Sequence, residues 1–249
     1  MVEIQIDVPG CEDTIRIIPG FLQSYGIDPA ETWAQLLEHG SYDDDAVPPS
    51  GGVTLWTPGT NTAMLYRGNA IPRHKMWMQT GDPHDVGLIK YGYTGWQWNV
   101  ARATIDVAMC PAVQSVAECI NDVMSMDSKS PHNHWIATKY LSGNDNIGAH
   151  SDKTRTIEDG TEIVVAKLGS ARPFRVEDLD GNLLFEESLE AGTAIFMLSD
   201  GANVHSKHSV PKVAGFEEVT GSIVGRTIKT IVPWLKVEKE IVKSQRRKK

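Results

Sequence analysis

The sequence predicts an α+β protein that is mainly β, with helices packed on the outside of a jelly-roll core. Helical patterns are confined to the first half of the chain, and short apolar, β-branched runs fill the second half. Gly, Asp and Asn interrupt these runs at a spacing typical of a β-sandwich or barrel. A chain of 249 residues can bury a substantial core, and single β-rich domains commonly reach this length.

Two amphipathic helices are expected in the first half. Asp28-Pro29 precedes a pattern of apolar residues that ends before Gly40, which predicts a capped helix. Pro111 opens the second helix, whose apolar side chains share one stripe. Such a stripe predicts a core face packed against a sheet. Its members are Val113, Val116, Ala117, Ile120, Val123 and Met124.

The second half predicts a series of short strands that begins at Trp135. Each run is rich in apolar and β-branched residues and is bounded by turn formers. The run that ends at Leu198 is almost wholly apolar, which is typical of a buried strand. The expected strands cover 135–141, 162–168, 173–177, 183–186, 193–198 and 222–232.

The motif His150-Ser151-Asp152 is the strongest chemical signal in the chain. On a strand, residues at i and i+2 share one face about 6.6 Å apart. An imidazole and a carboxylate then point at a common spot and supply two thirds of a 2-His-1-carboxylate site for iron(II). His208 is the preferred third ligand, because it follows a buried strand and a short loop that can bring the chain back to the site. His205, three residues earlier, remains the competing candidate.

Five blocks, in the same order, resemble the AlkB-type Fe(II)/2-oxoglutarate-dependent dioxygenases. They cover most of the chain, and the core block contains Tyr140 and the His150-x-Asp152 motif. The P-R and Y-x-Y-T-G blocks resemble the family's substrate lid. The blocks are Phe21-Leu22, Pro72-Arg73 with Tyr91 to Gly95, Asn133 to Asp152, Gly169 to Phe174, and His208 to Lys212.

The resemblance implies a double-stranded β-helix that binds Fe(II) and 2-oxoglutarate and reacts with O2. His150, Asp152 and His208 would be the metal ligands and the catalytic centre. Tyr140 and Thr138 would contact the cosubstrate, although the family usually has Asn at the position of Thr138.

An arginine is the expected anchor for the distal carboxylate of 2-oxoglutarate, because its planar fork matches a carboxylate. The family's strand resembles R-x-x-L-T-x-R. If Thr230 is its threonine, Arg226 is the first arginine, which holds that carboxylate, and Val232 replaces the second. A shifted register makes Arg226 the second arginine and leaves Thr220 at the first position. The register that uses Thr230 is preferred.

The implied activity is oxidative demethylation of N-alkylated bases in nucleic acid, as in DNA repair. Arg73, Tyr91 and Tyr93 combine cations with π-faces, as expected where an extruded base is stacked. Arg172 is a further candidate substrate contact. Lys153-Thr154 stands where many relatives carry acidic residues that help to recognise the base. The alternative is an oxygenase of the same fold that acts on a protein, a nucleoside or a small metabolite.

Charge favours local contacts over a broad phosphate-binding surface. The net charge is -8, and the stretch 236–249 carries a net +5, which leaves the rest near -13. Methylated DNA or RNA would therefore be bound by a few local cations. The expected organisation is an N-terminal extension with helices (1–60), a dioxygenase domain with its lid (61–235) and a basic tail (236–249).

Cysteine usage favours an intracellular protein, cytoplasmic or nuclear. The cysteines are Cys11, Cys110 and Cys119, and they form no paired framework or metal-binding spacing. The first residues have neither a basic nor an apolar leader region, and no long apolar run occurs. No membrane association is expected, and the expected state is a monomer.

Overall fold

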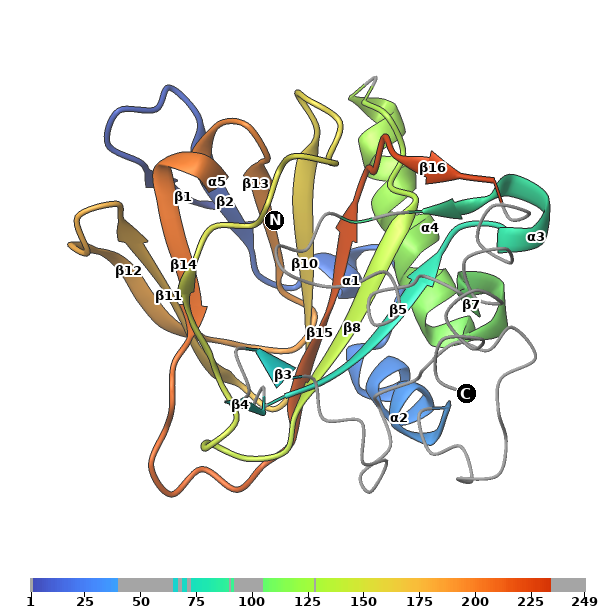
Figure 1. The fold of residues 1–249 in the computed structure, drawn as a ribbon. Helices are drawn as coiled ribbons and strands as arrows, with labels where there is room; N and C mark the ends of the chain where they lie inside the picture. The colour runs from blue at the N-terminus through green and yellow to red at the C-terminus, as the bar shows by residue number, and fades with distance from the viewer. Residues whose placement is uncertain are drawn as a thin grey trace, which may run out of the picture.

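Two mainly antiparallel sheets face each other and enclose one of the two buried clusters of the protein (Figure 1). The computed structural model describes residues 2–39, 65–66, 69–70, 73–89, 91, 105–127 and 129–233. The larger sheet has the order β1 (Ile4–Asp7), β2 (Thr14–Ile18), β13 (Ala194–Leu198), β10 (Glu162–Gly169), β15 (Thr220–Arg226), β8 (His134–Tyr140), β5 (His74–Gln79) and β7 (Ile105–Asp106). The smaller sheet has the order β12 (Leu183–Leu189), β11 (Arg172–Asp178), β14 (Ser206–Val210) and β9 (Ile147–His150).

The chain passes repeatedly from one sheet to the other. From β8 onward it runs through the larger sheet, β9 of the smaller, β10 of the larger, and β11 with β12 of the smaller. It then returns to the larger sheet at β13, crosses to β14 and ends in the larger sheet at β15. This winding is that of a double-stranded β-helix, so the predicted fold class is confirmed.

Helices cover the outer face of the larger sheet, as the sequence predicts. Three helices lie on the side away from the smaller sheet (Figure 1), namely α1 (Phe21–Ser24), α2 (Pro29–His39) and α4 (Pro111–Met126). Asp28 caps α2 by accepting a hydrogen bond of 2.8 Å from the amide of Ala30. Trp33 of α2 and Val113 of α4 join one buried cluster with outward-facing Ala166 and Ile223. Alternate residues of the same strands face the space between the sheets.

Several features of the sheets were not predicted from the sequence, among them the strands β5, β7 and β14. The strands β1 and β2 extend the larger sheet beyond β13, in a region where only helices were expected. The predicted strand 222–232 is wrong as a single element, because β15 ends at Arg226 and β16 (Ile231–Val232) pairs elsewhere, with β6 (Leu88–Ile89). The Asn133 side chain takes the place of a neighbouring strand at Ile228. It accepts a hydrogen bond from the Ile228 amide at 2.8 Å and donates one to the Ile228 carbonyl oxygen at 3.0 Å.

The remaining elements are short. They are α3 (Pro83–Val86), α5 (Ala202–His205), the 3-10 helix η1 (Val107–Met109), β3 (Leu65–Tyr66) and β4 (Asn69–Ala70). The predicted domain boundary near residue 60 and the tail 236–249 lie outside the described residues, so the domain division stays a prediction. Among the described helices, none has the length and apolar character needed to cross a membrane.

Gly221 sets how closely α2 approaches the larger sheet. A Cβ atom there would lie 2.5 Å from both the Thr138 carbonyl oxygen and the Trp33 ring. We expect Gly221→Ala to lower the free energy of unfolding by about 1–3 kcal/mol, the usual cost of overpacking. Gly148→Ala is the control, because its Cβ would meet nothing within 4 Å. Thermal or denaturant unfolding measures both, and equal stabilities would contradict this packing.

Candidate metal centre and cosubstrate pocket

Three potential metal ligands converge between the smaller sheet and the loop after β9. His150 ends β9, Asp152 follows it, and His208 lies on β14, where it is the direct cross-strand neighbour of His150. One ligand atom from each residue lies within 4.8 Å of the others. His205 ends α5, and its Nδ1 lies 3.1 Å from the Gly201 carbonyl oxygen, outside this cluster. The geometry therefore favours His208 over His205.

Both imidazoles are held in the neutral form that binds metal ions. The Nδ1 atom of His150 lies 2.9 Å from the Gly148 carbonyl oxygen, which leaves Nε2 as an acceptor facing Asp152 at 3.8 Å. Burial lowers the pKa of His150, and it lowers the pKa of His208 to about 3. Since a metal ion competes with protons for these nitrogens, neutral imidazoles favour metal binding at neutral pH.

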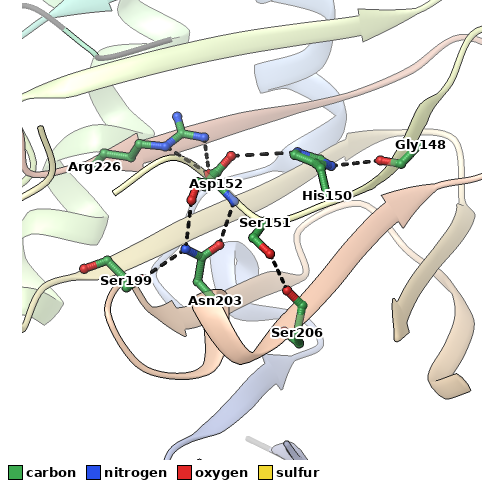
Figure 2. A network of polar contacts seen from close by, with 8 residues as sticks. All are labelled: Gly148, His150, Ser151, Asp152, Ser199, Asn203, Ser206 and Arg226. Atoms are coloured by element: carbon green, nitrogen blue, oxygen red, sulfur yellow. Dashed lines mark hydrogen bonds and ion pairs between the residues drawn. The ribbon is translucent and has the colours of Figure 1, made fainter. Parts of the chain in front are cut away.

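Asp152 is ionised by its surroundings. Arg226 of β15 donates from Nε to Asp152 Oδ2 at 3.1 Å and contacts the same oxygen through Nη2 (Figure 2). Burial alone would raise the pKa of this carboxyl, but the Arg226 guanidinium outweighs it, and the pKa lies below its ordinary value. The other oxygen, Oδ1, faces His150. Asp152 is thus a fixed, charged ligand with one oxygen directed at the imidazoles.

Asn203 of α5 fixes the backbone of Asp152, a role that no pattern in the sequence predicted. Its Oδ1 accepts from the Asp152 amide at 2.8 Å, and its Nδ2 donates to the Asp152 carbonyl at 3.2 Å (Figure 2). Ser151 adds a hydrogen bond of 2.6 Å to the Ser206 carbonyl oxygen. The loop between His150 and Asp152 is therefore tied to the segment that leads into His208.

The donor set fits a divalent transition metal. Two neutral imidazoles and one carboxylate are the ligands of the facial 2-His-1-carboxylate site, which leaves coordination positions open. A metal with bonds of about 2.1 Å needs ligand atoms about 3 Å apart, a small closure from the 4.8 Å limit seen here. The Nδ1 atom of His208 is buried and has no hydrogen-bond partner among the described residues.

A pocket extends from this cluster into the space between the sheets. The predicted cosubstrate residues Tyr140, Thr138 and Arg226 all line it. Tyr140 and Thr138 lie on the inner face of β8, directly opposite Thr220 and Ser222 of β15. Val165, Phe174, Ile195 and Val224 supply apolar walls. Metal ligands, polar groups and apolar walls therefore form one cavity.

Two lysines in the pocket were missed by the sequence analysis. Lys75 of β5 and Lys167 of β10 both line the cavity and are 5% and 8% exposed. Burial lowers the pKa of Lys167 to about 7. The alternation of β10 could have placed Lys167 on the inner face, but only the facing strand shows that this face borders a cavity.

The three predicted substrate residues that the structure describes each contact other groups of the protein. Arg73 donates to the Asn146 carbonyl at 3.1 Å, and Tyr91 is buried with its ring centroid 4.8 Å from the Arg226 guanidinium carbon. Arg172 is fully buried and its guanidinium donates to backbone carbonyls that include Ser142 and Pro211. Tyr93 lies outside the described residues. The geometry supports structural roles for Tyr91 and Arg172, and substrate binding stays a prediction for all four.

The position of Arg226 favours the second of the two registers. Its guanidinium is engaged by Asp152, and Thr230, on which the preferred register relied, lies beyond the end of β15. Thr220 begins β15, six residues before Arg226, and faces the pocket at the position of the first arginine in the shifted register.

The fold and the inward-facing cluster define the class of this protein: a double-stranded β-helix with a candidate metal site at one end of its pocket. The chain is similar to the solved structure of OsALKBH1, with 13% identity, a TM-score of 0.53, and coverage of 91% of this chain and 100% of that one. The name of that protein places it among the AlkB homologues, so the resemblance in the sequence and the likeness in structure agree on the fold.

A second similar structure is a prolyl hydroxylase from Trichoplax adhaerens in complex with a fragment of a hypoxia-inducible factor degradation domain. It shares 10% identity with a TM-score of 0.49, and the match covers 86% of this chain and 83% of that one. No protein-family model matches the chain. No curated protein matches it either.

Proposed function

We propose that this protein is an Fe(II)/2-oxoglutarate-dependent dioxygenase. The observation that carries the proposal is the convergence of His150, Asp152 and His208 at one end of a pocket inside a double-stranded β-helix. Bound iron(II) would supply oxidation of a substrate C–H bond by O2, coupled to conversion of 2-oxoglutarate into succinate and carbon dioxide. The protein supplies ligands of the right charge and a cavity for the organic acid.

The residues of the chain prepare this site in three ways. Burial keeps His150 and His208 neutral, so their nitrogens are free to bind the metal. Arg226 keeps Asp152 ionised, and Asn203 fixes the position of its backbone. The inner face of β8 offers the hydroxyl groups of Tyr140 and Thr138 to an organic acid in the pocket.

The substrate we propose is an N-methylated base in DNA or RNA. Hydroxylation of an N-methyl group gives a hemiaminal, which releases formaldehyde and the unmodified amine. Support comes from the lid-like blocks around Arg73 and Tyr93 in the sequence and from Lys75, a cation inside the pocket. Since the chain outside the basic stretch 236–249 is strongly acidic, we expect binding of nucleic acid to be micromolar and to weaken steeply with salt.

The alternative is an oxygenase of the same fold that acts on a protein, a nucleoside or a small metabolite. It is favoured by Lys153 and Thr154, which follow Asp152 where many nucleic-acid-modifying relatives carry acidic residues. Lys153 is exposed, so a positive charge lies on the surface close to the metal ligands in the chain. The residues after Asp152 would then select a substrate other than a methylated base.

Succinate and formaldehyde release over a panel of methylated oligonucleotides tests both proposals. The purified protein, supplied with Fe(II), ascorbate, 2-oxoglutarate and O2, should release succinate, and one or more methylated strands should increase the rate and release formaldehyde. Unmethylated strands of the same sequence are the control. If succinate forms but no methylated DNA or RNA stimulates it, the alternative substrate class replaces nucleic acid. If no succinate forms under any condition, the dioxygenase proposal fails.

A further inference from the structure

Lys167 lies at the end of the pocket away from the candidate metal ligands. It is on the inner face of β10, paired in register with Ser222 of β15. Its ammonium reaches the Thr220 hydroxyl at the start of β15, whereas Arg226 at the end of that strand reaches Asp152. Ser222 and Val224 line the pocket between these two positions. The cavity thus has a metal-binding end and a lysine end.

The buried ammonium of Lys167 contacts only neutral groups. It donates to the carbonyl oxygens of Leu168 at 3.2 Å and Ser170 at 3.3 Å, and to the Thr220 hydroxyl. Within the described part of the chain, no carboxylate forms an ion pair with it. A buried charge without an ion-pair partner is costly, and one that borders a cavity is well placed to receive an anion.

The other cations that line the pocket are committed elsewhere or lie at the other end. Arg226 is paired with Asp152, and Arg172 donates to a set of loop carbonyls. Lys75 acts on the pKa of His150, at the metal end, whereas the charged neighbours of Lys167 are Arg172 and Glu190. Lys167 is therefore the cation best placed to neutralise a ligand that reaches away from the metal.

We propose that Lys167, with Thr220 and Tyr140 beside it, binds the distal carboxylate of 2-oxoglutarate. The inference rests on the proposed dioxygenase function and assigns the anchor of its cosubstrate. In the shifted register, Thr220 stands where the resembling family has its anchoring arginine. The Lys167 ammonium arrives at that threonine from the neighbouring strand, so a lysine on β10 supplies the charge that β15 lacks. Arg226 then serves as the positioning residue of Asp152.

The test compares two oxo acids that differ only at the distal end. 2-Oxoglutarate and 2-oxobutanoate share the 2-oxo acid group, but only the first carries a distal carboxylate. Each is titrated calorimetrically into the Mn(II)-loaded protein without O2, so binding is measured apart from turnover. Lys167→Met should weaken 2-oxoglutarate binding about 10–100-fold, as expected for loss of a charged hydrogen bond, and change 2-oxobutanoate binding less than about twofold.

Matched variants separate the anchor from a general effect of charge. Lys75→Met removes a positive charge from the same cavity and should leave the preference for 2-oxoglutarate over 2-oxobutanoate intact. Lys167→Arg keeps a cation and should keep most of the preference. Thermal unfolding and Mn(II) affinity of Lys167→Met should match the wild type, because methionine fills a similar volume without a buried charge.

The outcomes distinguish this inference from the function on which it rests. If Lys167→Met retains the preference for 2-oxoglutarate, the inference is wrong. Loss of the preference in Arg226→Met instead would restore Arg226 as the anchor, as the first register predicts. If the wild-type protein with Mn(II) binds neither acid, the proposed function itself fails and the assignment of Lys167 falls with it.

Discussion

Replacement of His150, Asp152 or His208 is expected to abolish metal binding and turnover. Each residue would contribute one ligand to a single ion, so each loss should lower metal affinity more than about a hundredfold. Removal of a residue that only contacts a ligand costs about 10–100-fold. We suggest alanine for the histidines and Asp152→Asn for the carboxylate, since asparagine keeps the shape of the side chain beside Arg226. Metal affinity can be followed through Co(II) absorption, and turnover through succinate release.

His205→Ala is the matched control for the metal centre. It removes a histidine three residues from His208 that takes no part in the cluster. We expect this variant to bind metal and to turn over like the wild type. Loss of metal binding in His205→Ala together with its retention in His208→Ala would show that the ligand assignment is wrong.

Arg226→Met is expected to destabilise the metal-free protein by about 3–5 kcal/mol, because it leaves a buried carboxylate without its cation. The side chains of Arg226 and Asp152 are only 5% and 9% exposed, so water cannot replace the lost partner. A divalent metal supplies positive charge to the same carboxylate. Mn(II) should therefore stabilise the variant more than the wild type, as measured by denaturant unfolding with and without the ion.

The same substitution should change the pH dependence of stability. Since the pKa of Asp152 is lower in the folded than in the unfolded protein, its ion pair stabilises the fold above the unfolded pKa of about 4. That contribution is lost as the pH falls below this value. The difference in unfolding free energy between wild type and Arg226→Met should therefore shrink in acid. A constant difference from pH 7 to pH 3 would contradict the role of the ion pair.

Lys229→Met is the control for the Arg226 experiments. Lys229 follows β15 closely and forms an ion pair of 3.1 Å with Asp159, but the two side chains are 44% and 80% exposed. Exposed pairs contribute about 0–1 kcal/mol, so this variant should unfold like the wild type. A loss as large as that of Arg226→Met would mean that general charge, and not burial of the pair, sets the effect.

Local pattern was enough to predict most of the fold. The stripe that begins at Val113 marks a helix that covers a sheet, and the apolar runs from Trp135 onward become strands of a double-stranded β-helix. These features depend on the periodicity of neighbouring residues, which the sequence contains. The strands β1, β2, β5 and β14 were not predicted, because pairing with distant strands decides them. The end of β15 at Arg226 was missed as well, because the Asn133 side chain decides it.

The sequence by itself determined the types of ligand in the candidate site, because His150 and Asp152 are two residues apart and share a strand-like spacing. Only the tertiary structure decided between His208 and His205, since cross-strand pairing of β9 with β14 places one of them opposite His150. It also placed Arg226 against Asp152 and Lys167 against Thr220, pairs separated by 74 and 53 residues. Contacts at such separations depend on which strands become neighbours, and no local pattern in the chain specifies that.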